Sequence, residues 1–296
     1  MAASGRFIRM RAEVASPIDN AEAALPAGPL HWLRAGALEV AVAPAAGGRI
    51  AQLRHDGVEW LVGEGEGEGG QAAIAWGCYP MVPWAGRIRR GRFEFDGVAR
   101  SLPINFERHA IHGLGFSRPW QVDDVAGNAM TLSLALPEDA YWPFGGTVVQ
   151  TLRVQPHRLQ LHLVVQAGDN AMPAALGWHP WFRKPDRLLF SPESMYPRDG
   201  EGIATLPRVP PVPGPWDDCF VAGGEIALLR AGQRLRLRSD CDHWVVYDRA
   251  GHATCVEPQT GPPDGFTLAP HRLEPGQALA TAFELEWEQA RGSGPE

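Results

Sequence analysis

The stretch "GTVVQTLRVQPHRLQLHLVVQAG", residues 146–168, decides the fold class. Apolar and polar residues alternate through it in two runs, which meet at the pair Pro156 and His157. A period of two places successive side chains on opposite faces of an extended strand, so each run predicts a β-strand with one buried face. Together the two runs predict a hairpin of long antiparallel strands.

The same alternation recurs along the chain. In "AMTLSLALP" (129–137) the apolar residues fall on one face, and in "RLRLRS" (234–239) arginines alternate with leucines, as a strand with one solvent face requires. The dipeptide Asp56–Gly57 joins two short strand-like runs and is a hairpin signal. Helical periodicity over ten or more residues is nearly absent. We therefore expect an all-β protein built as one large antiparallel β-sandwich.

The domain organisation follows from composition. No linker-like break divides the strands, so we predict a single domain over residues 29–290. Residues 1–28 are small, polar and Pro-bearing, which predicts an extended N-terminal lead-in. The segment "GEGEGEGGQ" (63–71) has little to pack and is typical of a mobile surface loop.

Charge and cysteine usage exclude several functions. The net charge is −7, and without a basic surplus there is no case for a nucleic-acid or anionic-membrane partner. The 4 cysteines form no CxxC pair, so neither a zinc knuckle nor a disulfide framework is expected. No apolar stretch is long enough for a signal peptide or for a membrane span. These features indicate a cytoplasmic protein with free thiols.

Ionisable residues outside the alternating strands gather in a few turn-rich, aromatic-flanked segments. Loops on a rigid scaffold commonly carry binding and catalytic residues, so these segments are the candidates for a site. They are "YPMVPWAGRIRRGRFEFDG" (79–97), "INFERHAIHGLGFSRPW" (104–120), "GWHPWF" (177–182), "GPWDDCF" (214–220) and "CVEPQTGPPDGF" (255–266).

The chemistry that these residues suit is bifunctional acid–base catalysis. A glutamate with an ordinary pKa near 4.3 is a base at neutral pH, and a histidine near 6.5 can donate a proton. Held on opposite sides of a small polar molecule, Glu257 and His179 would remove one proton and deliver another. A metal site is disfavoured, because His109 and His112 lack a chelating i, i+4 partner and Arg87 adds positive charge. A glycosidase with Asp217 and Glu257 as its two carboxylates stays open.

At these segments the sequence resembles the aldose 1-epimerases, or galactose mutarotases, over residues 30–285. The resemblance rests on five motifs in the family's order: "PWAGRIRRGRFEFDG", "HAIHGLGFSRPW", "GWHPWF", "WDDCF" and "CVEPQT". It implies a β-sandwich of the galactose mutarotase-like super-sandwich type. It also implies interconversion of the α and β anomers of a free monosaccharide, with no cofactor and no metal.

The resemblance also assigns roles to individual residues. Glu257 would be the base that takes the proton from the anomeric hydroxyl, and His179 the acid that protonates the ring oxygen. The remaining substrate-binding candidates are Arg87, His112, Asp217, Trp84 and Trp181. The chain departs from the family at Gly86, where Asn is common, and at Trp181, where tyrosine or another aromatic residue is usual. A neutral aldose is favoured over a hexose phosphate, because we identify no basic cluster for a phosphate in the site segments beyond Arg87 and Arg118. A non-catalytic sugar-binding protein on the same fold stays open as an alternative.

Overall fold

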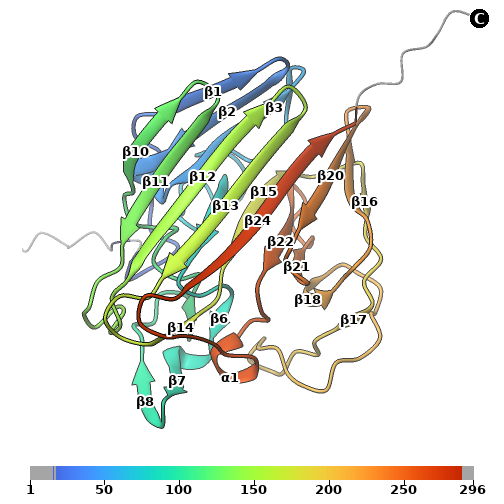
Figure 1. The fold of residues 1–296 in the computed structure, drawn as a ribbon. Coiled ribbons are helices and arrows are strands. Elements are labelled where there is room, and N and C mark those ends of the chain that lie inside the picture. Colours follow the sequence, from blue (N-terminus) through green and yellow to red (C-terminus); the bar gives the residue numbers. More distant parts are fainter. Residues whose placement is uncertain (1–15, 17, 289–296) are drawn as a thin grey trace, which may run out of the picture.

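Two large antiparallel sheets face each other and form the body of the molecule (Figure 1). The structure is a computed structural model that describes residue 16 and residues 18–288. About half of the chain is strand and very little is helix, so the predicted all-β sandwich is confirmed. The lead-in and the domain limits at residues 28 and 290 stay predictions, because parts of both lie outside the described residues.

The first sheet has ten strands and carries most of the candidate site residues. In the order in which they pair, its strands are β1 (His31–Ala35), β2 (Leu38–Ala43), β3 (Arg49–His55), β5 (Cys78–Met81), β15 (Gly177–Arg183), β22 (Ala253–Gln259), β21 (His243–Tyr247), β18 (Asp217–Val221) and β17 (Ser194–Met195), with β4 (Val58–Glu59) paired to β3. The predicted hairpin at Asp56–Gly57 joins β3 to β4.

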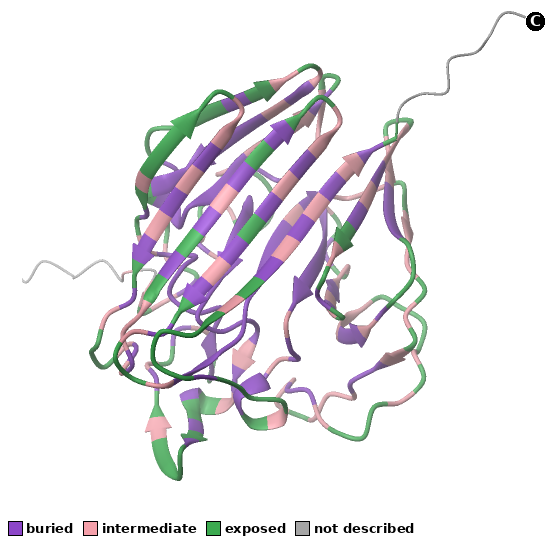
Figure 2. Cartoon of the chain, in the orientation of Figure 1, coloured by how far each residue is buried: buried purple, intermediate pink, exposed green. Residues whose placement is uncertain are grey.

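The second sheet has eight strands and lies in front of the first in Figure 1. Its strands, in order, are β10 (Gln121–Ala126), β11 (Ala129–Ala135), β12 (Thr147–Gln155), β13 (Arg158–Gln166), β24 (Ala278–Trp287), β20 (Gln233–Ser239), β19 (Ile226–Arg230) and β16 (Arg187–Leu189). The predicted hairpin at Pro156–His157 joins β12 to β13. Buried and exposed residues alternate along these strands, as the bands of Figure 2 show.

Short elements close one end of the sandwich. They are the pairs β6 (Arg87–Ile88) with β9 (Ala110–Ile111), β7 (Arg92–Phe95) with β8 (Val98–Ser101) and β14 (Met172–Ala174) with β23 (His271–Leu273), the 3-10 turns η1 (Pro44–Ala46) and η2 (Arg89–Gly91), and the helix α1 (Gly265–Leu268). Among the described residues, no helix is long and apolar enough to cross a membrane.

The main core lies between the two sheets and includes apolar side chains from both, such as Trp178, Val256 and Phe283. All four cysteines are buried and unpaired, which agrees with the expectation of free thiols. The ten-stranded sheet has a second buried face, because Tyr79, Phe116 and neighbouring residues form a separate apolar cluster on β5 and the adjoining loops. A sheet that is covered on both faces can hold polar side chains away from solvent, and this second face is where the candidate site lies.

Candidate active site

A cleft of about 640 Å³ opens over the second face of the ten-stranded sheet. It brings together six of the seven residues that the sequence nominated: His179, Glu257, Arg87, His112, Asp217 and Trp181. The other lining residues include Glu22, Glu68, Phe106, Glu107, Tyr247 and Gln259. Residues far apart in the sequence thus surround one space of a size that suits a small ligand.

Both His179 and Glu257 lie on strands, which for His179 corrects the expectation of a turn-rich segment. Both lie at the centre of the ten-stranded sheet, on β15 and β22, which pair directly. Along β15, Trp178 and Phe182 point into the main core, so His179 points the opposite way, into the cleft. Strands buried on both faces show no polar alternation, which is why the sequence pattern did not reveal β15.

His179 and Glu257 meet at the floor of the cleft. Nε2 of His179 lies 3.3 Å from Oε1 of Glu257, and both side chains are almost completely buried. Burial, with the nearby carboxylate of Asp217, raises the pKa of Glu257 well above its usual range. Burial lowers the pKa of His179, and the buried guanidinium of Arg49 contributes. These opposite shifts mean that a proton on the pair favours the carboxyl group over the imidazole in the free protein.

Two aromatic rings clamp the imidazole of His179. The ring of Tyr79 stacks on it at a centroid distance of 4.8 Å, and the ring of Trp181 stacks on it at 5.4 Å. The hydroxyl of Tyr79 and the Nε1–H of Trp181 both donate to the carbonyl oxygen of Ile74, at 3.0 and 2.7 Å. The shared acceptor fixes both rings, so the imidazole is held in one orientation.

A buried cation, Arg49, lies against the ring of Tyr79. Arg49 is fully buried and its guanidinium donates to the carbonyl oxygens of Ala46, Ala73, Trp76 and Phe116. Its Cζ lies 5.0 Å from the centroid of the Tyr79 ring, so the cation also supports the clamp. Burial lowers the pKa of Arg49 to about 9. The sequence offered no signal for Arg49, which lies outside the motifs.

Arg87 and His112 come from the strand pair β6–β9 and its continuation. The N–H of His112 donates to the carbonyl oxygen of Gly86 at 3.0 Å, which places His112 beside Arg87. Gly86 has φ +69°, and a Cβ there would lie 3.0 Å from Cα of Pro263, so the Asn common in the family would be strained at this position. His112 itself has φ +58°, an uncommon conformation for a residue with a side chain, which is often seen at functional sites.

Asp264 ties Arg87 to the segment that follows Glu257. Its N–H donates to the carbonyl oxygen of Arg87 at 2.6 Å, and its Oδ1 accepts from the N–H of Arg89 at 2.9 Å. The side chain is nearly buried, and this burial raises its pKa. The sequence did not nominate Asp264, although it lies in the quoted "CVEPQTGPPDGF" segment.

Asp217 is the first residue of β18 and lines the cleft. An ion pair with Arg198 partly neutralises its carboxylate. Nη1 of Arg198 lies 2.7 Å from Oδ2 of Asp217 and also donates to the carbonyl oxygen of Asp217. Because the carboxylate is held by an arginine, it keeps acceptor capacity for a ligand but is poorly placed to act as a free acid or nucleophile.

Trp84 is the one nominated residue that lies elsewhere, and its assignment to the site is corrected. It is 3% exposed, belongs to the main core and stacks on Trp142 at 5.9 Å. His109, considered for a metal site, is also outside the cleft lining, where its Nδ1 accepts from the N–H of Arg90 at 3.1 Å.

Metal donors are present at the floor of the cleft, but they fit a cation poorly. His179, Cys255 and Glu257 each offer one ligand atom, and these atoms lie within 4.8 Å of one another. Cys255 is completely buried, and burial raises the pKa of its thiol well above the ordinary value, which opposes the thiolate that a soft metal requires.

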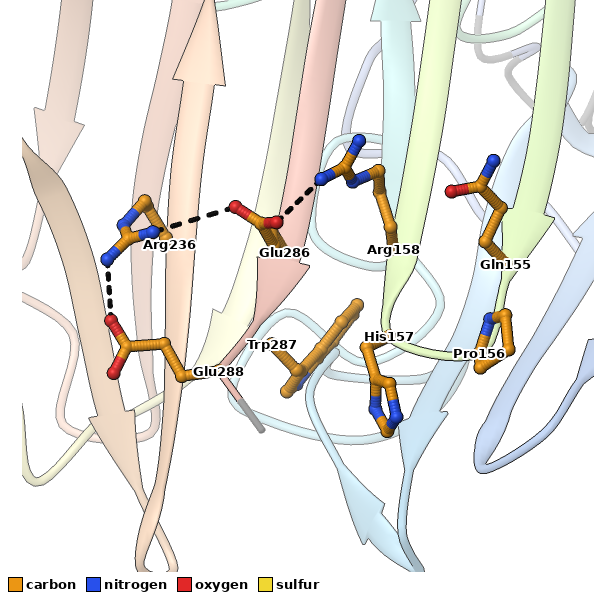
Figure 3. Close-up of a pocket in the computed structure, with 8 residues that line it drawn as sticks. All are labelled: Gln155, Pro156, His157, Arg158, Arg236, Glu286, Trp287 and Glu288. Carbon is orange, nitrogen blue, oxygen red and sulfur yellow. Dashed lines mark hydrogen bonds and ion pairs between the residues drawn. The ribbon is translucent and has the colours of Figure 1, made fainter. Parts of the chain in front are cut away.

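A second hollow of about 880 Å³ lies on the eight-stranded sheet, away from the cleft (Figure 3). Its charged side chains are used in ion pairs, since Glu286 lies 2.7 Å from Arg158 and Glu288 lies 2.6 Å from Arg236. It contains no paired acid and base with unused capacity, so we place the candidate site in the smaller cleft.

Comparison with known proteins identifies the family of this chain. The family model for aldose 1-epimerase matches residues 29–196, more than half of the chain. The chain belongs to the aldose 1-epimerase family. This membership accounts for the resemblance of the motifs and for the sandwich that positions them.

Solved structures share the fold of this family member at low sequence identity. A putative aldose 1-epimerase from Escherichia coli K12 superposes with a TM-score of 0.76 at 22% identity, covering 88% of this chain and 99% of that one. A galactose 1-epimerase from Lactobacillus acidophilus NCFM superposes with a TM-score of 0.74 at 16% identity, covering 88% and 94%.

Among curated sequences, two uncharacterized proteins of Escherichia coli K12 are similar to this family member. YphB is 27% identical over 235 residues, which is 69% of this chain and 79% of YphB. YihR is 33% identical over 106 residues, and this match spans only about a third of either protein, 34% of each.

Proposed function

We propose that the protein is an aldose 1-epimerase that interconverts the α and β anomers of a free aldose. The observation that carries this proposal is the 3.3 Å separation of His179 Nε2 and Glu257 Oε1 at the floor of a cleft. The two oxygens of a hemiacetal are bonded to one carbon, so an acid and a base that act on both must themselves lie close together.

Ring opening then needs two proton transfers. Glu257 takes the proton of the anomeric hydroxyl while His179 gives its proton to the ring oxygen, and the C1–O5 bond breaks to leave an aldehyde. Rotation about the C1–C2 bond presents the other face of the carbonyl. The reverse transfers close the ring as the opposite anomer, and the pair regains its starting proton.

The number of protons on the pair is conserved over this cycle. In the free protein the shared proton favours Glu257, so the productive form arises when it moves to His179 as the sugar binds. The positive charge of Arg87 lowers the pKa of both groups, so it does not by itself decide which of them holds the proton. Activity therefore requires that the pair carry one proton, neither none nor two.

The remaining lining residues suit a sugar. Arg87, His112 and Asp217 supply donors and acceptors for hydroxyl groups, and Trp181 offers an aromatic face to the C–H face of the ring. Arg87 keeps donor capacity for a ligand, because its Nε is buried without a hydrogen-bond partner among the described residues and its ion pair with Glu107 is long, at 4.0 Å from Nη2 to Oε2.

The charges around the cleft favour a neutral aldose. Glu22, Glu68, Glu107 and Asp217 line it together with Arg87 as the single arginine. A sugar phosphate would bring its negative charges against these carboxylates. The N-terminal segment and the Gly-rich loop, which supply Glu22 and Glu68, thus contribute to the cleft.

Polarimetry on a panel of freshly dissolved aldoses and hexose 6-phosphates tests the proposal. We expect optical rotation to reach equilibrium faster with the protein than without it for at least one neutral aldose. Spontaneous rates across the whole panel would leave a non-catalytic sugar-binding protein as the better account. Release of reducing sugar from glycosides would instead indicate a hydrolase using Asp217 and Glu257.

A further inference from the structure

Next to the base Glu257 lies Gln259, whose side-chain amide has a hydrogen-bond partner on only one of its two polar atoms. Gln259 is fully buried, lines the cleft and donates from Nε2 to Oε2 of Glu257 at 3.1 Å. Its Oε1 is buried and has no hydrogen-bond partner among the described residues. A buried acceptor without a partner is costly, and where it lines a cleft it indicates a ligand donor.

The fold makes room for this side chain at a specific place. Gln259 pairs with Gly177 across the β15–β22 ladder, and a Cβ on Gly177 would lie 2.5 Å from the carbonyl oxygen of Pro258 and 3.1 Å from Cγ of Gln259. Glycine is therefore required opposite the glutamine. Gln259 and Glu257 lie two residues apart on one strand, so both side chains leave the same face of the sheet.

We propose that Gln259 is a substrate-contacting residue that accepts a hydrogen bond from the hydroxyl on the carbon next to the anomeric carbon. This inference rests on the proposed function and deepens it. The amide donates to one oxygen of the base, which fixes the orientation of the amide and leaves Oε1 without a partner. With Glu257 at the anomeric hydroxyl, the neighbouring amide is close to the next carbon of the same sugar, and Oε1 is the acceptor that we assign to the hydroxyl there.

This assignment defines a substrate class. Aldoses with a hydroxyl at C2 satisfy the amide oxygen, whereas 2-deoxy aldoses leave it buried and unpaired. Sites built to hydrogen-bond a substrate hydroxyl reject analogues that lack it more strongly than apolar pockets discriminate by size. The protein therefore selects 2-hydroxy aldoses.

The test is a thermodynamic cycle between the residue and the substrate group. The kcat/KM for mutarotation is measured for D-galactose, 2-deoxy-D-galactose and 6-deoxy-D-galactose, with the wild type and Gln259→Leu. We expect loss of the 2-hydroxyl to cost the wild type about 10-fold to 100-fold. In Gln259→Leu the same loss should have less than about a threefold effect, while the effect of 6-deoxy substitution stays as in the wild type.

The alternative outcomes separate two failures. Equal 2-deoxy penalties in the wild type and the variant, or no penalty in the wild type, would overturn the role of Gln259 while leaving the epimerase intact. No acceleration with any aldose would remove the proposed function itself. Should Gln259→Leu fail to fold by circular dichroism, Gln259→Met, which keeps the length of the side chain but removes the amide, takes its place in the same cycle.

Discussion

His179 Nε2 and Glu257 Oε1 face each other at 3.3 Å from neighbouring central strands of the same sheet. Strand positions are held by hydrogen bonds on both sides, so this separation is more rigid than one between two loops would be. Both groups are buried, and their pKa values move in opposite directions from the ordinary ones.

The first prediction concerns pH. Because the pKa of His179 is lowered, the pair gains a second proton only in strong acid. Because the pKa of Glu257 is raised, the pair keeps its single proton to a higher pH than an ordinary glutamate would allow. After subtraction of the spontaneous rate, kcat/KM should fall less than about threefold from pH 7 to pH 5. A tenfold decline from pH 7 to pH 5 would show that a group with an ordinary histidine pKa governs the reaction.

The second prediction separates the two tryptophans that the sequence placed together. Trp84→Ala should destabilise the protein by about 3–5 kcal/mol, because it removes a buried core side chain. Trp181→Ala should cost less stability but lower kcat/KM by about tenfold or more, because it releases one side of the His179 clamp and removes the face for the sugar. Urea unfolding and polarimetry at a temperature where both variants are folded measure the two effects. Equal effects of both substitutions on kcat/KM would contradict the placement of Trp84.

The third prediction concerns Arg198, which holds the carboxylate of Asp217. Arg198→Met should raise KM about tenfold with a smaller change in kcat, since an acceptor of the substrate loses its orientation. Arg238→Met is the matched control, because Arg238 pairs with Glu286 on the eight-stranded sheet at 2.9 Å. If the two variants have the same KM, Arg198 does not position the ligand.

The fourth prediction concerns Asp264, which links Arg87 and Arg89 to the chain after Glu257. Asp264 has φ +59°, and asparagine tolerates this conformation and keeps the acceptor oxygen. Asp264→Asn should therefore retain KM within about twofold, whereas Asp264→Ala should raise it severalfold. An Asn variant as impaired as the Ala variant would indicate that the negative charge, and not the hydrogen bond, is what matters.

The eight-stranded sheet was predictable and much of the ten-stranded sheet was not, for a physical reason. Strands such as β12 and β13 have one solvent face, so their polar residues mark the period of two. β15 is buried along most of its length, and its sequence carries no such mark. The residue types of the site could still be identified from the sequence, since a histidine and a glutamate flanked by aromatic residues and prolines are unusual.

Most residues that position the site could not be predicted from the sequence. Tyr79 contacts His179 and Arg49 contacts Tyr79, and only the folded sheet creates these contacts. Gln259 is different, because its place two residues after Glu257 would have put both on one face had the segment been read as a strand. Trp84 was misplaced because a tryptophan in a Pro-rich turn suits a binding wall and a core equally well.

The most direct test of the central claim is the mutarotation rate of the wild type and Glu257→Gln on the aldose that the wild type accelerates most. Glutamine keeps the size of the side chain but cannot take the proton, so we predict a loss of about 100-fold to 10,000-fold in kcat with the fold intact. A Glu257→Gln variant that equilibrates the anomers as fast as the wild type would contradict the account.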